Sequence, residues 1–152
     1  MRNRLSLAVL LLLPLITVPV RAYSPDDRPP DQQSIDALRA RISQAQPREQ
    51  CYLYAELMHQ MTEFSVREYA AGNVDKASDL LKQVQQIAHK FHLSLADNDK
   101  RLKNAEILLR HTAFRLGEML HSSSYEDRPL VAETLAQVSQ IQNDTLLGVL
   151  RK

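Results

Sequence analysis

The feature that most constrains this chain is a helical spacing of apolar residues that recurs from residue 32 to residue 150. Large apolar side chains return at intervals of three and four residues, which is the period of an amphipathic helix with one face turned towards a core. No run of alternating polar and apolar residues, the pattern of a half-buried strand, interrupts this spacing. The spacing therefore predicts an all-α protein.

Turn and capping signals divide the pattern into five helices. Pro47 and Pro129 stand where helices are expected to begin, and Gly72-Asn73 is typical of a helix end in the left-handed conformation. The predicted helices cover residues 32–46, 48–71, 74–93, 99–121 and 129–150. The last four are joined by short links, which favours an up-down antiparallel four-helix bundle. The first is short and weakly apolar, so we expect it to be an accessory N-terminal helix.

The beginning of the chain has the layout of a secretory signal peptide. Arg2 and Arg4 form a basic start, residues 5–20 are almost entirely apolar, and Val20-Arg21-Ala22 places small side chains at the positions required for a cut before Tyr23. The apolar run has 16 residues, whereas a membrane-spanning helix needs about 20. The alternative is an uncleaved anchor. We expect an exported protein, periplasmic or extracellular.

Cleavage at this point changes the charge of the chain. The segment contains three of the 19 Lys and Arg residues and none of the 18 Asp and Glu residues, so the net charge falls from +1 to −2. Such a charge gives no reason to expect a nucleic-acid partner. The expected organisation is a signal peptide at 1–22, a flexible Pro- and Asp-rich leader at 23–31 and a single helical domain at 32–152. No membrane span is expected after cleavage.

Residue composition removes several classes of function. A single cysteine cannot form a disulfide within the chain, and three glycines cannot build a glycine-rich phosphate loop. The metalloprotease pattern HExxH, the hydrolase pattern GxSxG and a recognisable Ser/His/Asp constellation are missing from the sequence. We therefore expect a protein that is not an enzyme and that uses no cofactor.

One segment resembles a known repeat family. Residues 72–84 read GNVDKASDLLKQV, which is similar to the turn and second helix of a tetratricopeptide repeat, and Ser65 fits the small upstream position of that family. Glu68 and His89 depart from the tyrosine and the closing proline of the family, and no second copy follows. The resemblance implies a tight antiparallel helix pair. It implies neither a repeat protein nor a peptide-binding groove.

Two Glu-x-x-His pairs, Glu56–His59 and Glu118–His121, have the spacing found in carboxylate-bridged di-metal bundles. On a helical wheel each pair lies opposite the main apolar stripe of its helix, so both pairs are predicted to face solvent. The helices over 48–71 and 99–121 should also run parallel, which places the pairs at opposite ends of the bundle. We therefore predict no metal site from these pairs.

A second stripe on the helix over 99–121 is the candidate interaction site. It faces away from the main apolar stripe and consists of Ile107, His111, Phe114, Glu118 and His121. Two apolar residues seven positions apart are unexpected on a merely solvated face. The favoured interpretation is that the helix over 32–46 packs there. The functional interpretation is a partner or dimer surface rimmed by histidines, which would make the contact sensitive to pH.

Two single residues each have a structural and a functional interpretation. Glu68 falls in line with the apolar row of its helix, where a buried carboxylate could have a raised pKa and act as an acid or base. The favoured interpretation is that it reaches solvent or pairs with a Lys or Arg. Cys51 lies in the first turn of the same helix among apolar neighbours. We favour its burial over an intermolecular disulfide.

The functional prediction is an exported, soluble, non-enzymatic protein-interaction module, adaptor-like or chaperone-like, acting on a protein partner or by self-association. The alternative is a small-ligand or metal-binding helical bundle. Its polar groups would be His111, Glu118 and His121, or His89 and His92 with Asp97 and Asp99 just beyond them.

Overall fold

The computed structural model describes residues 29–95 and 101–151, and every regular element within them is an α-helix. The helices are α1 (Gln32–Gln44), α2 (Pro47–Ala70), α3 (Val74–Ser94), α4 (Leu102–Ser122) and α5 (Arg128–Leu150). The predicted all-α class is confirmed, and each described helix boundary lies within one turn of its predicted place. The predicted signal peptide and residues 23–28 of the predicted leader lie outside the described residues.

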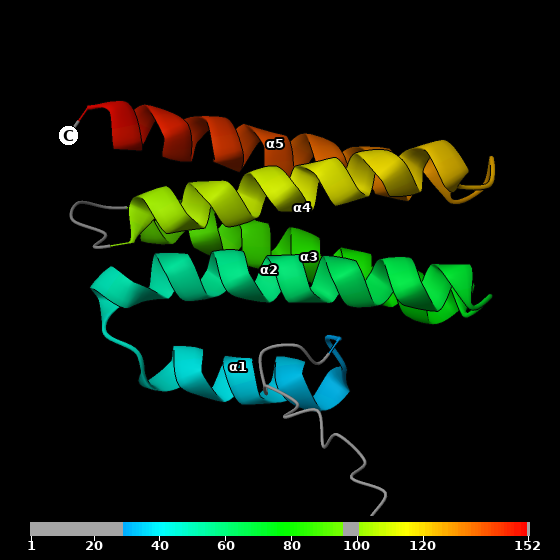
Figure 1. Cartoon of the computed structure of the whole chain (residues 1–152), viewed down its shortest axis with the longest axis horizontal. Helices are drawn as coiled ribbons and strands as arrows, with labels where there is room; N and C mark the ends of the chain where they lie inside the picture. Colours follow the sequence, from blue (N-terminus) through cyan, green and yellow to red (C-terminus); the bar gives the residue numbers. More distant parts are fainter. Residues whose placement is uncertain (1–28, 96–100, 152) are drawn as a thin grey trace, which may run out of the picture.

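The helices pack as two stacked hairpins with α1 on one side, which is a helical bundle in the broad sense (Figure 1). One hairpin is α2 with α3, and the other is α4 with α5. Between the hairpins, α2 contacts α4 and α3 contacts α5. Two hydrogen bonds connect α2 with α4: one joins His59 and Thr112, and in the other Arg115 donates to Glu63. The residue numbers of the bonded pairs increase together along both helices, so α2 and α4 run in the same direction.

The helix ends follow from local sequence chemistry. Asp31 and Ser34 form a capping box at the start of α1, and Pro47 occupies the first turn of α2. Gly72 has a φ of 85°, a left-handed conformation that costs a glycine little, and it turns the chain from α2 into α3. At the same end of the bundle, the Tyr69 hydroxyl donates to Asp127 at 3.0 Å and accepts from the Ser124 amide at 2.9 Å.

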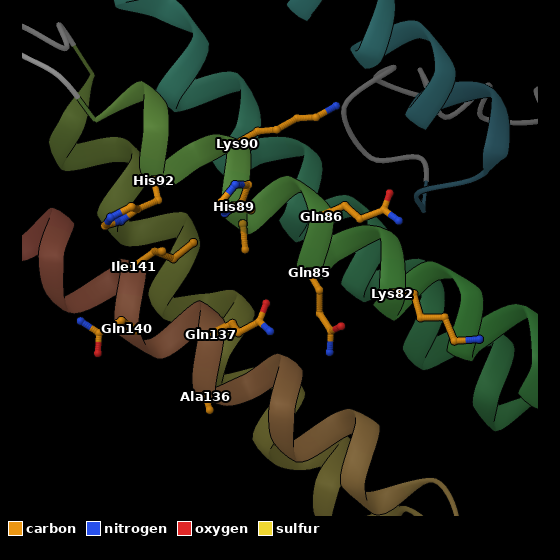
Figure 2. A pocket seen from close by; sticks show the side chains of 11 residues that line it. Lys82, Gln85, Gln86, His89, Lys90, His92, Ala136, Gln137, Gln140 and Ile141 are labelled. Carbon is orange, nitrogen blue, oxygen red and sulfur yellow. The ribbon is translucent and has the colours of Figure 1, made fainter.

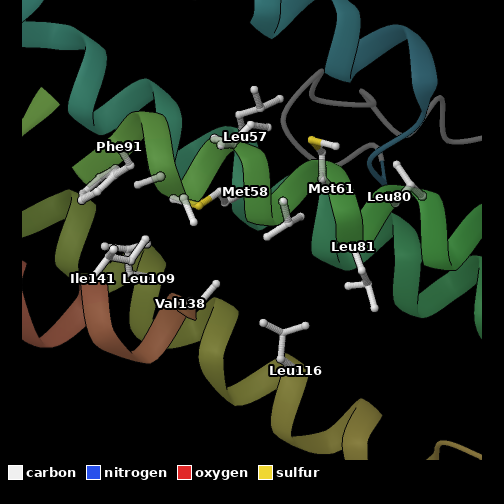
Figure 3. Packing of buried hydrophobic residues seen from close by; sticks show 14 of the residues in the cluster. Leu57, Met58, Met61, Leu80, Leu81, Phe91, Leu109, Leu116, Val138 and Ile141 are labelled. Carbon is white, nitrogen blue, oxygen red and sulfur yellow. The ribbon is translucent and has the colours of Figure 1, made fainter. Parts of the chain in front are cut away.

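A continuous apolar core runs between the two hairpins (Figure 3). Met58 and Met61 of α2 and Phe91 of α3 have no exposed surface, and neither do Leu109 and Leu116 of α4. Removing a side chain of this size from water stabilises the fold by roughly 1.5–3 kcal/mol. The predicted apolar stripes therefore form the core.

Polar residues of two kinds are also buried in the core. Thr112, Thr134 and Thr145 are fully buried, and each hydroxyl donates to the carbonyl four residues earlier in its own helix. Glu106 is 7% exposed, and its carboxylate accepts a hydrogen bond from Gln142 at 2.9 Å and pairs with Arg110 at 3.4 Å. Their polar groups are buried because partners are available within hydrogen-bonding distance.

The position of α1 corrects the favoured interpretation of the second stripe. We expected this helix to cover the outer face of α4, but it packs through Ile35, Leu38 and Ile42 against α2 and, within the described residues, does not reach α4. Arg39 bonds to Gln83 of α3, and Arg67 of α2 bonds to the carbonyl of Pro30. The short apolar face of α1 is therefore buried against the α2–α3 hairpin.

None of the helices in the described residues combines the length and apolar character that crossing a membrane requires.

Replacing Leu109 with alanine should lower the free energy of unfolding by about 2–5 kcal/mol, because it leaves a cavity between the hairpins. Urea denaturation followed by circular dichroism measures this loss. Leu147→Ala on α5 is the matched control, because Leu147 is 52% exposed, and its effect should stay within about 0.5 kcal/mol. Equal losses from both variants would contradict the packing described for α4.

Candidate functional site

The five residues of the second stripe lie on the outer side of α4, and none of them is fully buried. Phe114 is 66% exposed, while His111, Glu118 and His121 are exposed and Ile107 is half-buried. We call this set, together with the neighbouring Arg110, Arg115 and Gly117, the α4 surface. A phenyl ring held in water on a regular helix is a feature that the fold itself does not require.

A cavity of about 750 Å³ adjoins Phe114 in the seam between α2 and α4. Its lining consists of His59, Glu63, Arg110, His111, Phe114 and Arg115. Of these residues, His111 and Phe114 belong to the predicted stripe, whereas His59, Glu63, Arg110 and Arg115 were not predicted there. His59 was missed because the helical wheel placed it on a solvated side of its helix. The contacts of His59 and Glu63 with α4 instead place both side chains at the seam between the hairpins.

Charged side chains in this cavity are paired with one another. The Arg115 Nε donates to Glu63 Oε1 across the seam at 2.7 Å, and the same guanidinium bonds to Glu118 on its own helix. Hydrogen bonds to Glu63 and then to Glu118 raise the pKa of Arg115 above its usual value. Arg115 therefore holds two carboxylates in place beside Phe114.

His59 is the partly buried titratable group of the cavity. Its Nδ1 lies 3.3 Å from Thr112 Oγ1, and the Thr112 hydroxyl donates its single hydrogen to the Leu108 carbonyl at 2.8 Å. The Thr112 hydroxyl can therefore accept from Nδ1 in the tautomer that carries its hydrogen there. Burial lowers the pKa of His59, Glu63 opposes that shift, and His111 and Arg115 add to it. The rings of His59 and His111 stand edge-on with centroids 6.4 Å apart.

A second and larger concavity lies between α3 and α5 (Figure 2). We call it the α3–α5 groove, and its volume is about 1180 Å³. Gln85 donates to Thr134 at 3.0 Å and His92 lies 3.8 Å from Asp144, so two polar contacts cross between α3 and α5. The predicted ligand residues His89 and His92 line it. Asp97 and Asp99, grouped with them in the sequence analysis, lie outside the described residues.

The positions of Glu68 and Cys51 agree with the favoured interpretations of these two residues. Glu68 lies 3.4 Å from Lys76 and accepts a hydrogen bond from Asn73 at 2.8 Å. The Asn73 hydrogen bond above all, and Lys76 with it, lower the pKa of Glu68, which contradicts a raised pKa there. Cys51 is completely buried. Across residues 29–95 and 101–151, no three His, Cys, Asp or Glu side chains gather closely enough to hold a metal ion.

Comparison with known proteins gave no match to a family model, to a curated protein or to a solved structure.

The His59 environment predicts a pH dependence of stability. Because the pKa of His59 in the folded protein is lower than its ordinary value of 6.5, the unfolded chain binds more protons between the two values. The contribution of His59 is complete above pH 6.5 and decreases as the pH falls through 6.5 towards the lower folded-state pKa. His59→Gln should therefore flatten the decrease in the urea midpoint between about pH 7.5 and about pH 5.

The matched control for this measurement is His121→Gln, which changes an exposed histidine in the last turn of the same helix as Thr112. This variant should keep the wild-type dependence on pH. A slope that His59→Gln leaves unchanged would mean that His59 is not the group whose protonation destabilises the fold.

Proposed function

We propose that this chain is an exported, soluble helical module, adaptor-like or chaperone-like, that binds a protein partner through the α4 surface and does not act as an enzyme. In this proposal the signal peptide at 1–22 directs export, and the scaffold is an up-down four-helix bundle, α2 to α5, with α1 as an accessory helix. A protein partner is proposed in place of nucleic acid or a membrane.

The observation that carries the proposal is Phe114, which is 66% exposed beside a cavity on the same surface. Burying such a ring against a partner contributes roughly 1.5–3 kcal/mol. Interfaces typically depend on a few aromatic or arginine anchors that fill pockets and are surrounded by polar groups. The α4 surface offers the anchor, the neighbouring cavity and a charged rim that includes Arg110 and Glu118.

The polar groups of the cavity support a binding role over a catalytic one. Arg115 is engaged by Glu63 and Glu118, and His59 is engaged by Thr112. A general base must have its accepting atom within reach of a substrate proton, and a nucleophile must lie beside its base. Within the described residues, the lining of this cavity contains no serine, threonine, cysteine or lysine that could act as a nucleophile beside His59 or His111, and its ion pairs fix the shape and charge of the surface.

A photo-crosslinking residue at position 114 tests the α4 surface in the native host. The full chain is expressed with the crosslinker in place of Phe114 or, as the control, in place of Tyr125, which is 90% exposed in the turn before α5. We expect a discrete crosslinked product from position 114 and none from position 125. Equal labelling from both positions, or no product from position 114, would overturn this assignment of the surface.

The α3–α5 groove supports the second candidate, binding of a small ligand. Its volume of about 1180 Å³ is somewhat larger than the roughly 300–1,000 Å³ of typical ligand sites, and its lining includes Ala88 and Ile141, which are 3% and 5% exposed. Histidines His89 and His92 and several glutamines would supply the polar contacts. In this candidate the ligand, with or without a metal ion, occupies the groove.

Native mass spectrometry and metal analysis of the protein purified from its own compartment test this second candidate. If it is correct, a stoichiometric ligand or metal adduct accompanies the wild-type chain. Ala136→Trp, which places a large ring at the wall of the groove, should then remove a small-molecule adduct without changing the helical signal. A wild-type chain that carries neither ligand nor metal would overturn the second candidate.

A further inference from the structure

We propose that the partner of the α4 surface is a second copy of this chain, and that the two copies pair through antiparallel α4 helices about a two-fold axis at Phe114. This inference rests on the proposed function, because it assigns a partner to the same surface. Three observations carry it: a glycine that the single chain does not need, the symmetric order of side chains around Phe114, and the presence of both a protruding ring and a cavity.

Gly117 lies in the interior of α4, where glycine is less favourable than alanine because its backbone loses more conformational freedom. Beyond its chain neighbours and the adjoining backbone of α4, a Cβ atom added at Gly117 would meet no atom within 4 Å, so packing inside the chain does not require glycine there. The backbone conformation does not require glycine at position 117 either. Among the glycines of the described residues, only Gly72 has a positive φ, the left-handed conformation that favours glycine. Gly117 stands one helical turn from Phe114 on the exposed side, where the lack of a side chain lets another helix approach closely.

The side chains along α4 are complementary to those of a second α4 helix that runs antiparallel to it. In an antiparallel pair centred on Phe114, a residue a given number of positions before Phe114 lies near the residue as many positions after it in the second copy. Arg110 then lies opposite Glu118 of the second copy, and His111 lies opposite Gly117 of the second copy. Long or basic side chains therefore meet a space without a side chain and a carboxylate.

A two-fold interface uses the same surface on both copies, so that surface must supply both halves of each contact. The exposed Phe114 ring and the 750 Å³ cavity adjoin each other, which lets each copy present its ring to the cavity side of the other. Arg110 and Glu118 are well exposed, with 61% and 47% of their side-chain surface accessible. Within one chain, Arg110 pairs with Glu106 and Glu118 pairs with Arg115. Both Arg110 and Glu118 nevertheless remain open to solvent, so each copy presents opposite charges to the other.

Sedimentation equilibrium of the full exported chain tests this pairing. A single pair of helices buries less surface than the ~1,600 Å² of a standard interface, so the measurement should extend from about 1 to about 500 µM. We expect the wild type to form a dimer in this range. Gly117→Leu and Phe114→Glu should each raise the dissociation constant by about 30-fold or more, which is the effect of losing an interface anchor.

Gly117→Leu keeps the test independent of folding. Because leucine favours a helix over glycine and the site is open in one copy, this variant should have an unchanged or higher melting temperature. Tyr125→Glu is the matched control for Phe114→Glu, because it adds the same charge in place of an exposed aromatic ring outside the α4 surface. It should dimerise as the wild type does.

A wild type that stays monomeric throughout the range, or a Gly117→Leu variant that dimerises as tightly as the wild type, would overturn the self-pairing. The crosslinker at position 114 separates this failure from failure of the proposed function. A product that contains a different protein rejects the second copy as partner and leaves the α4 surface in its binding role. The lack of any product rejects both.

Discussion

The packing of α2 determines how the rest of the molecule is arranged. This helix buries apolar side chains against α1, α3 and α4, and no other described helix contacts as many neighbours. Cys51, Met58 and Met61 have no exposed surface, and Leu57 and Phe64 are nearly buried. Once α2 is placed, α3 follows through the turn at Gly72 and α1 packs against the side of α2 away from α4. The second hairpin then rests on the remaining apolar face.

The seam between α2 and α4 combines this apolar packing with a polar edge. The buried Leu109 and Leu116 of α4 face the core, whereas His59 and Glu63 reach from α2 to Thr112 and Arg115. Each of these polar groups has a partner, which reduces the cost of removing it from water. These contacts therefore hold the polar residues that line the cavity beside Phe114 in place. The exposed Phe114 ring projects from a surface that both α2 and α4 support.

The helical spacing predicted the number of helices, their approximate bounds and most of the core, because one apolar face per helix is enough to define them. It could not predict which neighbour covers each face. For this reason α1 was expected on α4 but lies on α2, and His59 was expected in solvent but lies at the seam. Glu106 and Thr112 were missed because a polar residue on an apolar face is buried only when a partner from another turn or helix reaches it. The stripe around Phe114 was predicted from residue types, but its cavity required the placement of α2.

The hydrogen bonds of Tyr69 have a consequence for how the molecule unfolds. Its hydroxyl joins the end of α2 to Ser124 and Asp127 in the turn between α4 and α5. It therefore bridges the two hairpins at the end of the bundle opposite the start of α2 and the start of α4. Separating the hairpins requires breaking these bonds and exposing the apolar core in the same event. The two hairpins should therefore behave as one cooperative unit, and amides in α2 and α4 should exchange with solvent through a common opening.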